Sequence, residues 1–387
     1  MRPMSVKLVV CIGTRPEAIK LFPVVHALEA DGRFDVEVWV TAQHRGLLDQ
    51  VLRVARIKPA IDLDLMRAGQ TLTDITTAVV TRFGEALDAR RPDRVIVQGD
   101  TTTAFAASLA AFYRKIPVAH VEAGLRTGNI FSPWPEEANR KLLAVLADQH
   151  FAPTKRARDA LRAESVPSER VYVTGNTVVD ALLSIKDRLP EFREANAEIA
   201  RILPPPGSKQ RIILLTSHRR ENFAGGMERI ATAAARLALR DDVFIVFPVH
   251  PNPHVHKVMN ARLAGHPRIA LVPPLDYVPF IYLLTRCHLV LTDSGGVQEE
   301  APSIGKPVLV MRDTTERPEG VEAGTALLVG ADTDRIVREA TRLLDDDAAY
   351  LRMSRAHNPF GDGRASERIV DLIALAHVAE PTMRAVS

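Results

Sequence analysis

Residues 288–301 read HLVLTDSGGVQEEA. Their apolar start is typical of a short buried strand, the two glycines allow a tight turn, and the residues that follow are typical of a helix. A strand that leads through a tight turn into a helix is the repeating unit of parallel sheets covered by helices. This segment therefore predicts an α/β fold.

The same alternation of short β-branched runs and longer helical patterns continues on both sides of this segment. In the second half we expect strands at residues 211–216, 243–247, 269–272, 289–291, 308–311 and 326–329. Helices are expected there at about residues 226–239, 254–263, 277–285, 297–303, 333–344 and 364–377. The pattern indicates a doubly wound parallel sheet, whose ligands bind beyond the carboxyl ends of the strands.

The first half has the same periodicity, which predicts a second sheet of the same kind. Strands are expected at residues 7–12, 36–41, 94–98, 118–121, 150–152 and 171–173, and helices at 16–30, 72–89, 102–115, 135–147 and 154–164. Between the halves, Pro190 and the cluster Pro204-Pro205-Pro206-Gly207 predict a linker over about residues 189–210, because prolines do not continue a helix. We expect two Rossmann-like domains, residues 1–185 and 186–363, facing each other across a cleft.

Composition agrees with two domains and excludes some functions. The chain has 387 residues, 46% of them hydrophobic and 25% charged, which is too long for one ordinary domain. A net charge of +3 is far from the basic balance of a nucleic-acid-binding protein. Two distant cysteines in apolar runs, Cys11 and Cys287, indicate buried thiols of a reduced intracellular protein without disulfides. With no secretory signal and no spanning apolar stretch, we expect a cytoplasmic protein without a membrane partner.

The glycine turn within residues 288–301 has the features of a nucleotide diphosphate site. Helix N–H groups and the Ser294 hydroxyl, next to Gly295 and Gly296, are available to a phosphate oxygen. Six residues after the serine, the carboxylate of Glu300 can accept both hydroxyls of a ribose. No G-x-G-x-x-G follows the first strand and no P-loop motif occurs, so the nicotinamide and P-loop fingerprints are absent.

Three acidic groups follow predicted strands or begin a helix in the first half. Asp100 follows the strand 94–98, Glu122 follows the strand 118–121, and Glu136 begins a helix. Asp100 capping the next helix, and Glu136 favoured by the helix dipole, are the structural alternatives. Three carboxylates in one cleft could instead divide acid and base roles, because like charges resist joint ionisation.

Basic residues supply the complementary charge. Arg15 and Lys20 accompany the turn after the first strand, where exposed N–H groups suit an anion, although an ordinary glycine turn with solvated charges is an equal alternative. In the second half His218 and its neighbouring arginines form a charged run of the kind that is usually a solvated face, but its position directly after a strand is compatible with a phosphate-binding role. A metal site at His250, His254 and His256 is less favoured, because prolines interrupt the segment and no acidic or cysteine ligand completes a set.

Taken together, these motifs resemble the bacterial non-hydrolysing UDP-N-acetylglucosamine 2-epimerases. The resemblance spans about residues 6–375 and is carried, in the family's order, by GTRPEAIK, QGDTTT, HVEAGLRTGN, SPWPEEANR, GNTVVDA, SHRREN, PVHPNP and TDSGGVQEEAPSIGKPVLVMRDTTERPE. It implies a GT-B-like fold, with a carboxy-terminal helix at about residues 364–380 packing back on the first domain. It also implies a homodimer that needs no metal or redox cofactor and supplies a precursor of cell-surface polysaccharides.

The implied reaction is reversible inversion of C2 between UDP-N-acetylglucosamine and UDP-N-acetylmannosamine. UDP leaves as the C2 proton is removed, a 2-acetamidoglucal forms, and UDP adds back with a proton delivered to the opposite face. The family's catalytic positions fall on Asp100, Glu122, Glu136 and His218. Its substrate and nucleotide contacts fall on Arg15, Lys20, Phe280, Ser294, Gly295, Gly296, Glu300 and Arg317.

Some family members are activated by their own substrate at a second site. Gln43, His44, Arg219 and His250 match positions of that site, whereas Gly46 and Gly69 replace the Gln and Arg of some relatives, which leaves activation of this chain open. The alternatives for the function are a hydrolysing epimerase that releases UDP and N-acetylmannosamine, a GT-B glycosyltransferase that needs an acceptor, and a non-catalytic sugar-nucleotide-binding regulator. The intact PWPEEANR and TTERPE segments favour the non-hydrolysing class over the hydrolysing one. Three carboxylates at strand or helix ends fit proton transfer better than glycosyl transfer, and the filled acid/base positions disfavour a non-catalytic regulator.

Overall fold

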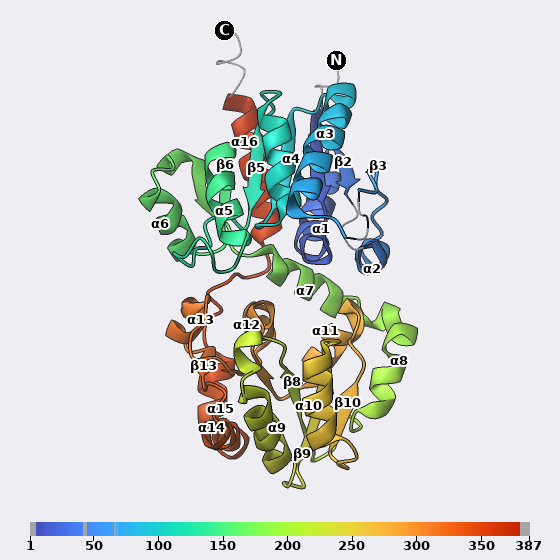
Figure 1. Cartoon of the computed structure of the whole chain (residues 1–387), viewed down its shortest axis with the longest axis vertical. Helices are drawn as coiled ribbons and strands as arrows, with labels where there is room; N and C mark the ends of the chain where they lie inside the picture. The colour runs from blue at the N-terminus through green and yellow to red at the C-terminus, as the bar shows by residue number, and fades with distance from the viewer. Residues whose placement is uncertain (1–4, 42–44, 66, 68, 380–387) are drawn as a thin grey trace. The chain divides into compact units, whose positions relative to one another are not determined.

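The computed structural model describes residues 5–41, 45–65, 67 and 69–379. It divides into two compact units, Met1–Ala181 with Gly361–Ser387, and Leu182–Phe360 (Figure 1). Each unit contains one parallel sheet with helices on its faces, so the predicted α/β class is confirmed.

The sheet of the first unit has seven strands in the order β3-β2-β1-β4-β5-β6-β7. Its strands are Val6–Ile12 (β1), Phe34–Val40 (β2), Ile61–Asp62 (β3), Arg94–Gln98 (β4), Val118–Val121 (β5), Gln149–Ala152 (β6) and Val171–Val173 (β7). All six strands predicted for this half are present, and β3, only two residues long, was too short to give a sequence pattern. The strand order reverses between β1 and β4, and a crevice for ligands forms beyond the carboxyl ends of such a pair.

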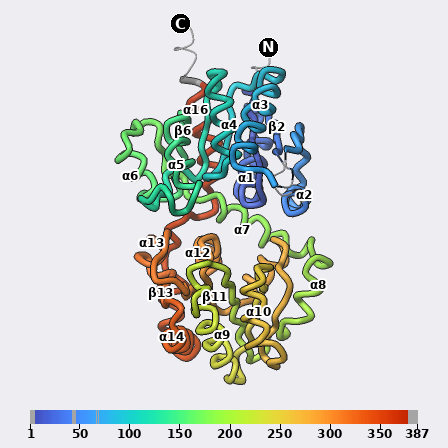
Figure 2. Tube along the Cα trace, in the orientation of Figure 1, coloured from blue at the N-terminus to red at the C-terminus, as the bar shows by residue number. Residues whose placement is uncertain are grey.

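Helices bury both faces of this sheet. They are Arg15–Ala30 (α1), Arg45–Val54 (α2), Leu72–Arg90 (α3), Thr102–Phe112 (α4), Glu136–Leu146 (α5), Lys155–Ala163 (α6) and Ala365–Ala379 (α16). On one face, α3, α4 and α5 bury a core that contains Trp39, Phe83 and Leu143. Helix α16 packs beside α1 on the chain's return from the second unit (Figure 2).

The carboxy-terminal helix is fastened to the first unit by two polar contacts. Asp180 accepts hydrogen bonds from the backbone N–H groups of Ser366 (2.7 Å) and Ala365 (3.3 Å), which satisfies donors at the start of α16. Gln149 donates to the backbone oxygen of Leu372 (3.1 Å). The last helix is therefore an integral part of the first unit although 179 residues of the second unit, Leu182–Phe360, precede it.

The sheet of the second unit has six strands in the order β10-β9-β8-β11-β12-β13. They are Arg211–Thr216 (β8), Val243–Pro248 (β9), Ile269–Val272 (β10), Leu289–Thr292 (β11), Val308–Val310 (β12) and Ala326–Leu328 (β13). Its helices are Arg193–Ile202 (α8), Gly226–Leu237 (α9), Pro253–Leu263 (α10), Tyr277–Arg286 (α11), Gly295–Glu300 (α12), Pro318–Glu322 (α13), Thr333–Asp345 (α14) and Asp347–Ser354 (α15). The strand order reverses between β8 and β11, and in sheets of this kind ligands bind beyond the carboxyl ends of such a pair.

The predicted linker over residues 189–210 contains a helix that the sequence pattern did not predict. Helix α7 (Thr177–Asp187) is followed by a short 3-10 turn and by α8, which ends before the proline cluster. Helix α8 buries Asn196 and Ile199 and packs against α11. The prolines therefore lie before and after this helix, where they interrupt none of its hydrogen bonds.

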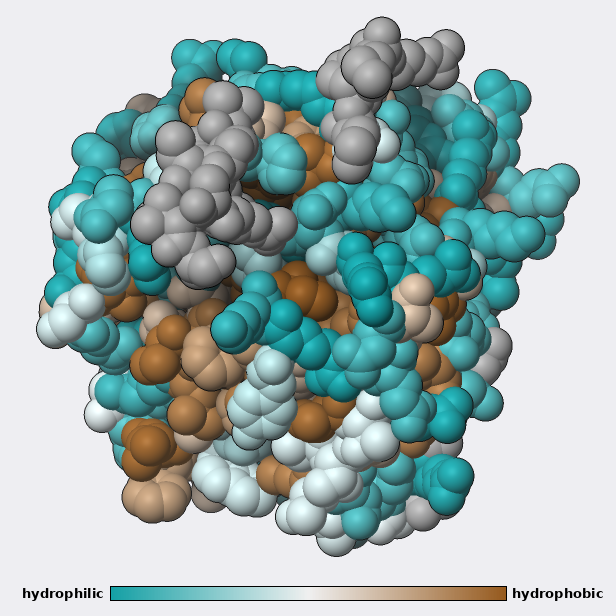
Figure 3. Space-filling view, turned by 90° about the horizontal axis from the view of Figure 1, so that it is seen from above, coloured by the Kyte–Doolittle hydropathy of each residue, from teal (hydrophilic) through white to brown (hydrophobic). Residues whose placement is uncertain are grey.

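Both cysteines are free and buried. No helix in the described part of the chain is long and apolar enough to cross a membrane. Seen from above, hydrophilic side chains cover much of the visible face and apolar ones form patches between them (Figure 3). Apolar surface of this kind is ordinary for a folded protein.

Candidate active site

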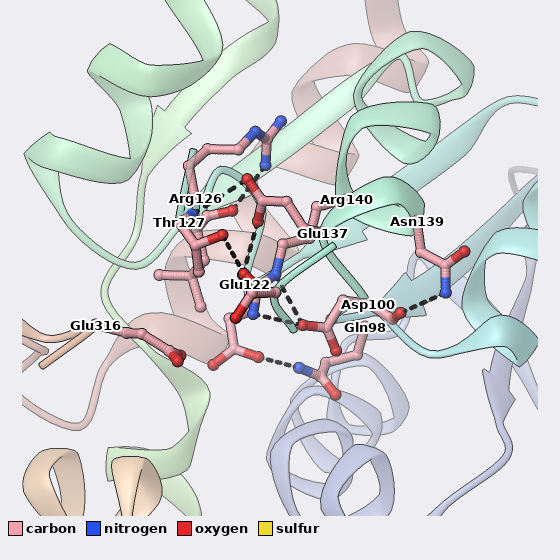
Figure 4. A network of polar contacts seen from close by, with 12 residues as sticks. Gln98, Asp100, Glu122, Arg126, Thr127, Glu137, Asn139, Arg140 and Glu316 are labelled. Atoms are coloured by element: carbon pink, nitrogen blue, oxygen red, sulfur yellow. Dashed lines mark hydrogen bonds and ion pairs between the residues drawn. The ribbon is translucent and has the colours of Figure 1, made fainter. Parts of the chain in front are cut away.

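Glu122 lies at the end of β5 and is held by donors from three other segments. Its carboxylate pairs with Lys20 Nζ of α1 (2.5 Å) and accepts a hydrogen bond from Asn176 Nδ2 (2.9 Å). It also accepts a hydrogen bond from Gln98 at the end of β4 (Figure 4). The side chain is 5% exposed. Cationic and amide donors stabilise a buried carboxylate in its charged form and leave it one orientation. The structure thus joins two of the predicted residues, Glu122 and Lys20.

The backbone of Glu122 has a conformation that supports this placement. Its φ is 61°, in the left-handed region that costs a residue with a side chain of order 1–3 kcal/mol. Gly99, at the end of the neighbouring strand, also has a positive φ of 72°. Such strain is maintained only where surrounding contacts fix the residue, and it occurs preferentially at functional sites.

Asp100, just after β4, belongs to a second, partly buried network (Figure 4). Its carboxylate binds Arg140 of α5 through Nε (2.8 Å) and Nη2 (2.7 Å), and its backbone oxygen accepts from Asn139 (2.9 Å). The alternative that Asp100 caps α4 is wrong, because the cap is Thr101, whose hydroxyl accepts from the Ala104 N–H. The Asp100 carboxylate is therefore oriented by an arginine.

Glu137 is a second carboxylate partner of Arg140. Its Oε2 accepts from Arg140 Nη1 (3.0 Å), and its Oε1 accepts from the backbone N–H groups of Thr127 (3.1 Å) and Gly128 (3.2 Å). Burial alone would lower the pKa of Arg140, but the charge of Asp100 and the hydrogen bond to Glu137 raise it above its ordinary value. Sequence reasoning missed both Glu137 and Arg140, although their i, i+3 spacing on a helix is a signal for such a pair.

Glu136, the predicted third carboxylate, is the first residue of α5 and is only partly buried. Unlike Glu137, it forms no side-chain hydrogen bond or ion pair with another residue of the described part of the chain. The structure therefore leaves this carboxylate outside the Asp100 and Glu122 networks.

The turn after β1 differs from the predicted anion site. Buried Glu17 accepts from the backbone N–H groups of Gly13 (3.0 Å) and Thr14 (2.6 Å), so these two donors are already bonded. Its other oxygen accepts from the Thr101 hydroxyl (2.7 Å), which ties the turn to the end of β4. Burial raises the pKa of Glu17 against these hydrogen bonds. Arg15, the first residue of α1, remains the candidate cation of this turn.

The close packing of this turn gives a testable consequence. A Cβ added at Gly13 would lie 2.6 Å from the hydroxyl of Thr103, which is fully buried. We expect Gly13→Ala to destabilise the protein by about 1–3 kcal/mol, because a well-packed interior does not accept an extra methyl group. Thermal unfolding measures this, with Gly46→Ala as the control, since nothing lies within 4 Å of a Cβ there. Equal melting temperatures for the two variants would contradict the packing shown by the structure.

In the second unit, Asp293 at the end of β11 is fully buried and accepts several hydrogen bonds from the segment after β8. Its donors are the Ser217 hydroxyl (2.8 Å), the backbone N–H groups of His218 (3.0 Å) and Arg219 (3.0 Å), and Asn222 Nδ2 (3.1 Å). Asp293 thus fixes the predicted His218 and Arg219. Sequence reasoning placed it in the quoted motif without giving it a role.

His218 has charged and aromatic neighbours. Its Nδ1 lies 3.4 Å from Asp293 Oδ1, and its ring stacks on His250 with centroids 5.2 Å apart and planes inclined by 17°. Burial lowers the pKa of His218 and Asp293 opposes this, while Arg219, His250 and Arg312 lower it further. Two of the residues predicted for a second substrate site, Arg219 and His250, therefore lie beside His218. The other two, Gln43 and His44, lie outside the described residues.

The predicted phosphate turn gathers several expected residues at the start of α12. Ser294 is the N-cap residue and its hydroxyl makes no capping hydrogen bond. A Cβ at Gly295 would lie 3.3 Å from Arg317 Cζ, so the guanidinium lies against the backbone of this turn. Arg317 is held there by Glu299 (2.8 Å) and Glu316 (3.0 Å).

The remaining predicted nucleotide contacts belong to the same unit. Gly296 is exposed in the first turn of α12, and Glu300 is buried at its end. Phe280 lies partly exposed on α11, and the described contacts do not join it to the phosphate turn. Among the described residues, no group of three or more His, Cys, Asp or Glu is arranged to hold a metal ion.

Comparisons with known proteins identify the family of the chain. The family model of UDP-N-acetylglucosamine 2-epimerase matches residues 26–374. A probable UDP-N-acetylglucosamine 2-epimerase of Ralstonia nicotianae is 55% identical over 368 residues, which cover 95% of this chain and 98% of that protein. The UDP-N-acetylglucosamine 2-epimerase of Escherichia coli K12 is 53% identical over 369 residues, with the same coverage of 95% and 98%.

A crystal structure extends the similarity to the fold. The UDP-GlcNAc 2-epimerase of Neisseria meningitidis, bound to UDP-GlcNAc, matches with a TM-score of 0.87 and 46% identity over 95% of this chain and 100% of that one. The predicted GT-B-like fold class and the predicted family are confirmed. The chain belongs to the UDP-N-acetylglucosamine 2-epimerase family, whose members are isomerases.

Proposed function

We propose that the enzyme interconverts UDP-N-acetylglucosamine and UDP-N-acetylmannosamine without hydrolysis, through elimination and re-addition of UDP. Family membership supports the substrate. The observation that carries the mechanism is the position of Asp100 and Glu122 at the ends of two adjacent strands, each carboxylate oriented by a basic side chain.

This chemistry requires groups that exchange protons at carbon. When the C2 proton is removed, its electron pair forms the C1=C2 double bond, while the C1–O bond breaks and its electron pair leaves with UDP. Re-addition of UDP at C1, with a proton delivered to the opposite face of C2, gives the epimer. Because the proton leaves one face of C2 and a proton arrives at the opposite face, more than one proton-transfer group is needed. We assign this work to Asp100, Glu122 and Glu136.

The departing diphosphate needs positive charge and hydrogen-bond donors. In this proposal His218, Arg317 and Arg15 supply charge, and Ser294 with the backbone of Gly295 and Gly296 supplies donors. Glu300 accepts the ribose hydroxyls, Phe280 packs near the uracil, and Lys20 keeps Glu122 oriented near the sugar.

Product analysis separates this reaction from its alternatives. The purified enzyme is incubated with UDP-N-acetylglucosamine alone, and the products are separated by anion-exchange chromatography. We expect UDP-N-acetylmannosamine at equilibrium with the starting material. Accumulation of UDP with free N-acetylmannosamine would identify a hydrolysing enzyme, and an unchanged substrate would favour a glycosyltransferase that lacks its acceptor.

Substitutions of the two adjacent glutamates, Glu136 and Glu137, are expected to affect different properties, turnover in one case and stability in the other. Glu137→Gln removes the charge that faces Arg140 in a fully buried site, which we expect to cost about 3 kcal/mol and to lower the melting temperature. Glu136→Gln changes a side chain outside that network, so we expect slower turnover at an unchanged melting temperature. Thermal unfolding and initial rates on both variants test this, and a lower melting temperature for Glu136→Gln alone would reverse the two assignments.

From the resemblance alone we further infer that the enzyme is a cytoplasmic homodimer that supplies precursors of cell-surface polysaccharides. Sedimentation velocity is expected to give twice the chain mass of 42.6 kDa. A monomer at micromolar concentration would contradict the inferred dimer.

A further inference from the structure

We propose that Asp293 is a positioning residue for the reaction, which orients His218 so that the ring presents Nε2 to the diphosphate. The proposal rests on the function proposed above for His218. It concerns a residue that contacts no reacting atom and acts through its neighbour.

The sheet topology places Asp293 where it can do this. Strands β8 and β11 are parallel neighbours, with Thr216 paired to Thr292, and they form the pair at which the strand order reverses. Asp293 directly follows β11, and its backbone N–H donates to the backbone oxygen of Thr216 at the end of β8 (3.3 Å). The Asp293 carboxylate therefore lies next to the segment that contains His218.

One buried carboxylate holds three consecutive residues of that segment. The Ser217 hydroxyl, the His218 N–H and the Arg219 N–H all donate to it at 2.8–3.0 Å. Asn222 adds a fourth donor and also donates to the Met311 backbone oxygen (3.3 Å), which links the segment to the chain after β12. Burying a carboxylate is costly unless it is fully hydrogen-bonded, and this one is well supplied with donors.

The His218 ring is restrained at one edge and on one face. Its Nδ1 faces Asp293 Oδ1 at 3.4 Å, and His250 stacks on the ring. A carboxylate beside Nδ1 favours a proton on that nitrogen, which makes Nε2 the nitrogen that can contact a ligand. The same negative charge favours the imidazolium form when an anionic diphosphate lies at Nε2.

The charges around the ring explain why a carboxylate is needed. Arg219, His250 and Arg312 all disfavour a positive charge on His218, as does burial of the ring. Asp293 is the group that counteracts them. Without this carboxylate the ring would lose both its preferred tautomer and the charge that complements the diphosphate.

The wild-type protein gives a first test that needs no substrate. In a sample with ¹⁵N-labelled histidine, long-range ¹H–¹⁵N spectra report which ring nitrogen carries the proton, with His218→Gln used to identify the signal. We expect neutral His218 to be protonated on Nδ1. Protonation on Nε2 would overturn the proposal even if the proposed epimerisation is correct, whereas Nδ1 protonation in an enzyme without turnover would contradict the proposed function alone.

A double-mutant cycle gives the second test. We expect Asp293→Asn to lower kcat at least tenfold at pH 8 and less at pH 6, since a lower His218 pKa is partly offset by acid. In a His218→Gln background the same change should cost nothing further, because Asp293 acts through His218. Ser217→Ala, which removes one donor without removing the carboxylate beside the ring, should lower the melting temperature and keep the wild-type pH profile. An Asp293→Asn variant with the wild-type pH profile, or with a full additional loss in the His218→Gln background, would overturn the proposal.

Discussion

Replacing Glu122 by glutamine is expected to lower kcat for epimerisation by about 10²-fold or more, with UDP affinity nearly unchanged. Glutamine keeps the size of the side chain, but it cannot take or give the C2 proton. The amide is also mismatched to its surroundings, because Lys20, Gln98 and Asn176 all donate toward this position. Initial rates and calorimetric titration with UDP measure the two effects separately.

Glu164→Gln is a matched control for this variant. Glu164 is a carboxylate of the same unit, at the end of α6, that pairs with Arg126 (2.7 Å) and Lys141 (3.2 Å). We expect this control to retain its turnover. If Glu122→Gln kept its turnover and lost UDP binding, Glu122 would be a ligand contact and not a proton-transfer group.

Asp100→Asn is expected to produce a loss of similar size, about 10²-fold or more in kcat, for a related reason. The substitution removes the carboxylate at the end of β4 and leaves Arg140 with Glu137 as its remaining carboxylate partner. In the proposed mechanism, proton transfer at one face of C2 then has no acceptor, and we expect nucleotide binding to be retained. Hydrogen exchange at C2 in D₂O should fall together with kcat.

The control for Asp100→Asn is Asp148→Asn. Asp148 also pairs with an arginine, both of its oxygens lying 2.8 Å from Arg94 Nη1, but it follows α5 instead of a strand. A decrease in kcat of similar size in both variants would mean that loss of an arginine pair, and not loss of a proton-transfer group, explains the effect.

The sequence was informative where short-range pattern determines the structure. Strands β4, β5 and β8 begin and end at the predicted residues, because buried parallel strands are short continuous apolar runs bounded by turn residues. Since these strands end at Gln98, Val121 and Thr216, the polar residues that follow them were placed correctly at the carboxyl ends of the strands.

The sequence was least informative about buried polar partners. Asp293 and Ser217 are 76 positions apart, and Arg140 and Asp100 are 40 apart, so their pairing depends on the strand order. Glu17 was not singled out in the sequence, yet its carboxylate takes up the donors that an anion was expected to use. Helix α8 was missed because its proline flanks suggested a linker, whereas its packing on α11 stabilises it.

The central claim is that C2 inverts through cleavage of its C–H bond, and proton NMR in D₂O tests it most directly. The wild-type enzyme is incubated with UDP-N-acetylglucosamine in D₂O and followed to equilibrium. We predict loss of the C2 proton signal from both UDP-sugars as solvent deuterium enters at C2, with little free sugar. Formation of UDP-N-acetylmannosamine that retains the C2 proton would contradict the account, because no elimination through a glucal can preserve that hydrogen.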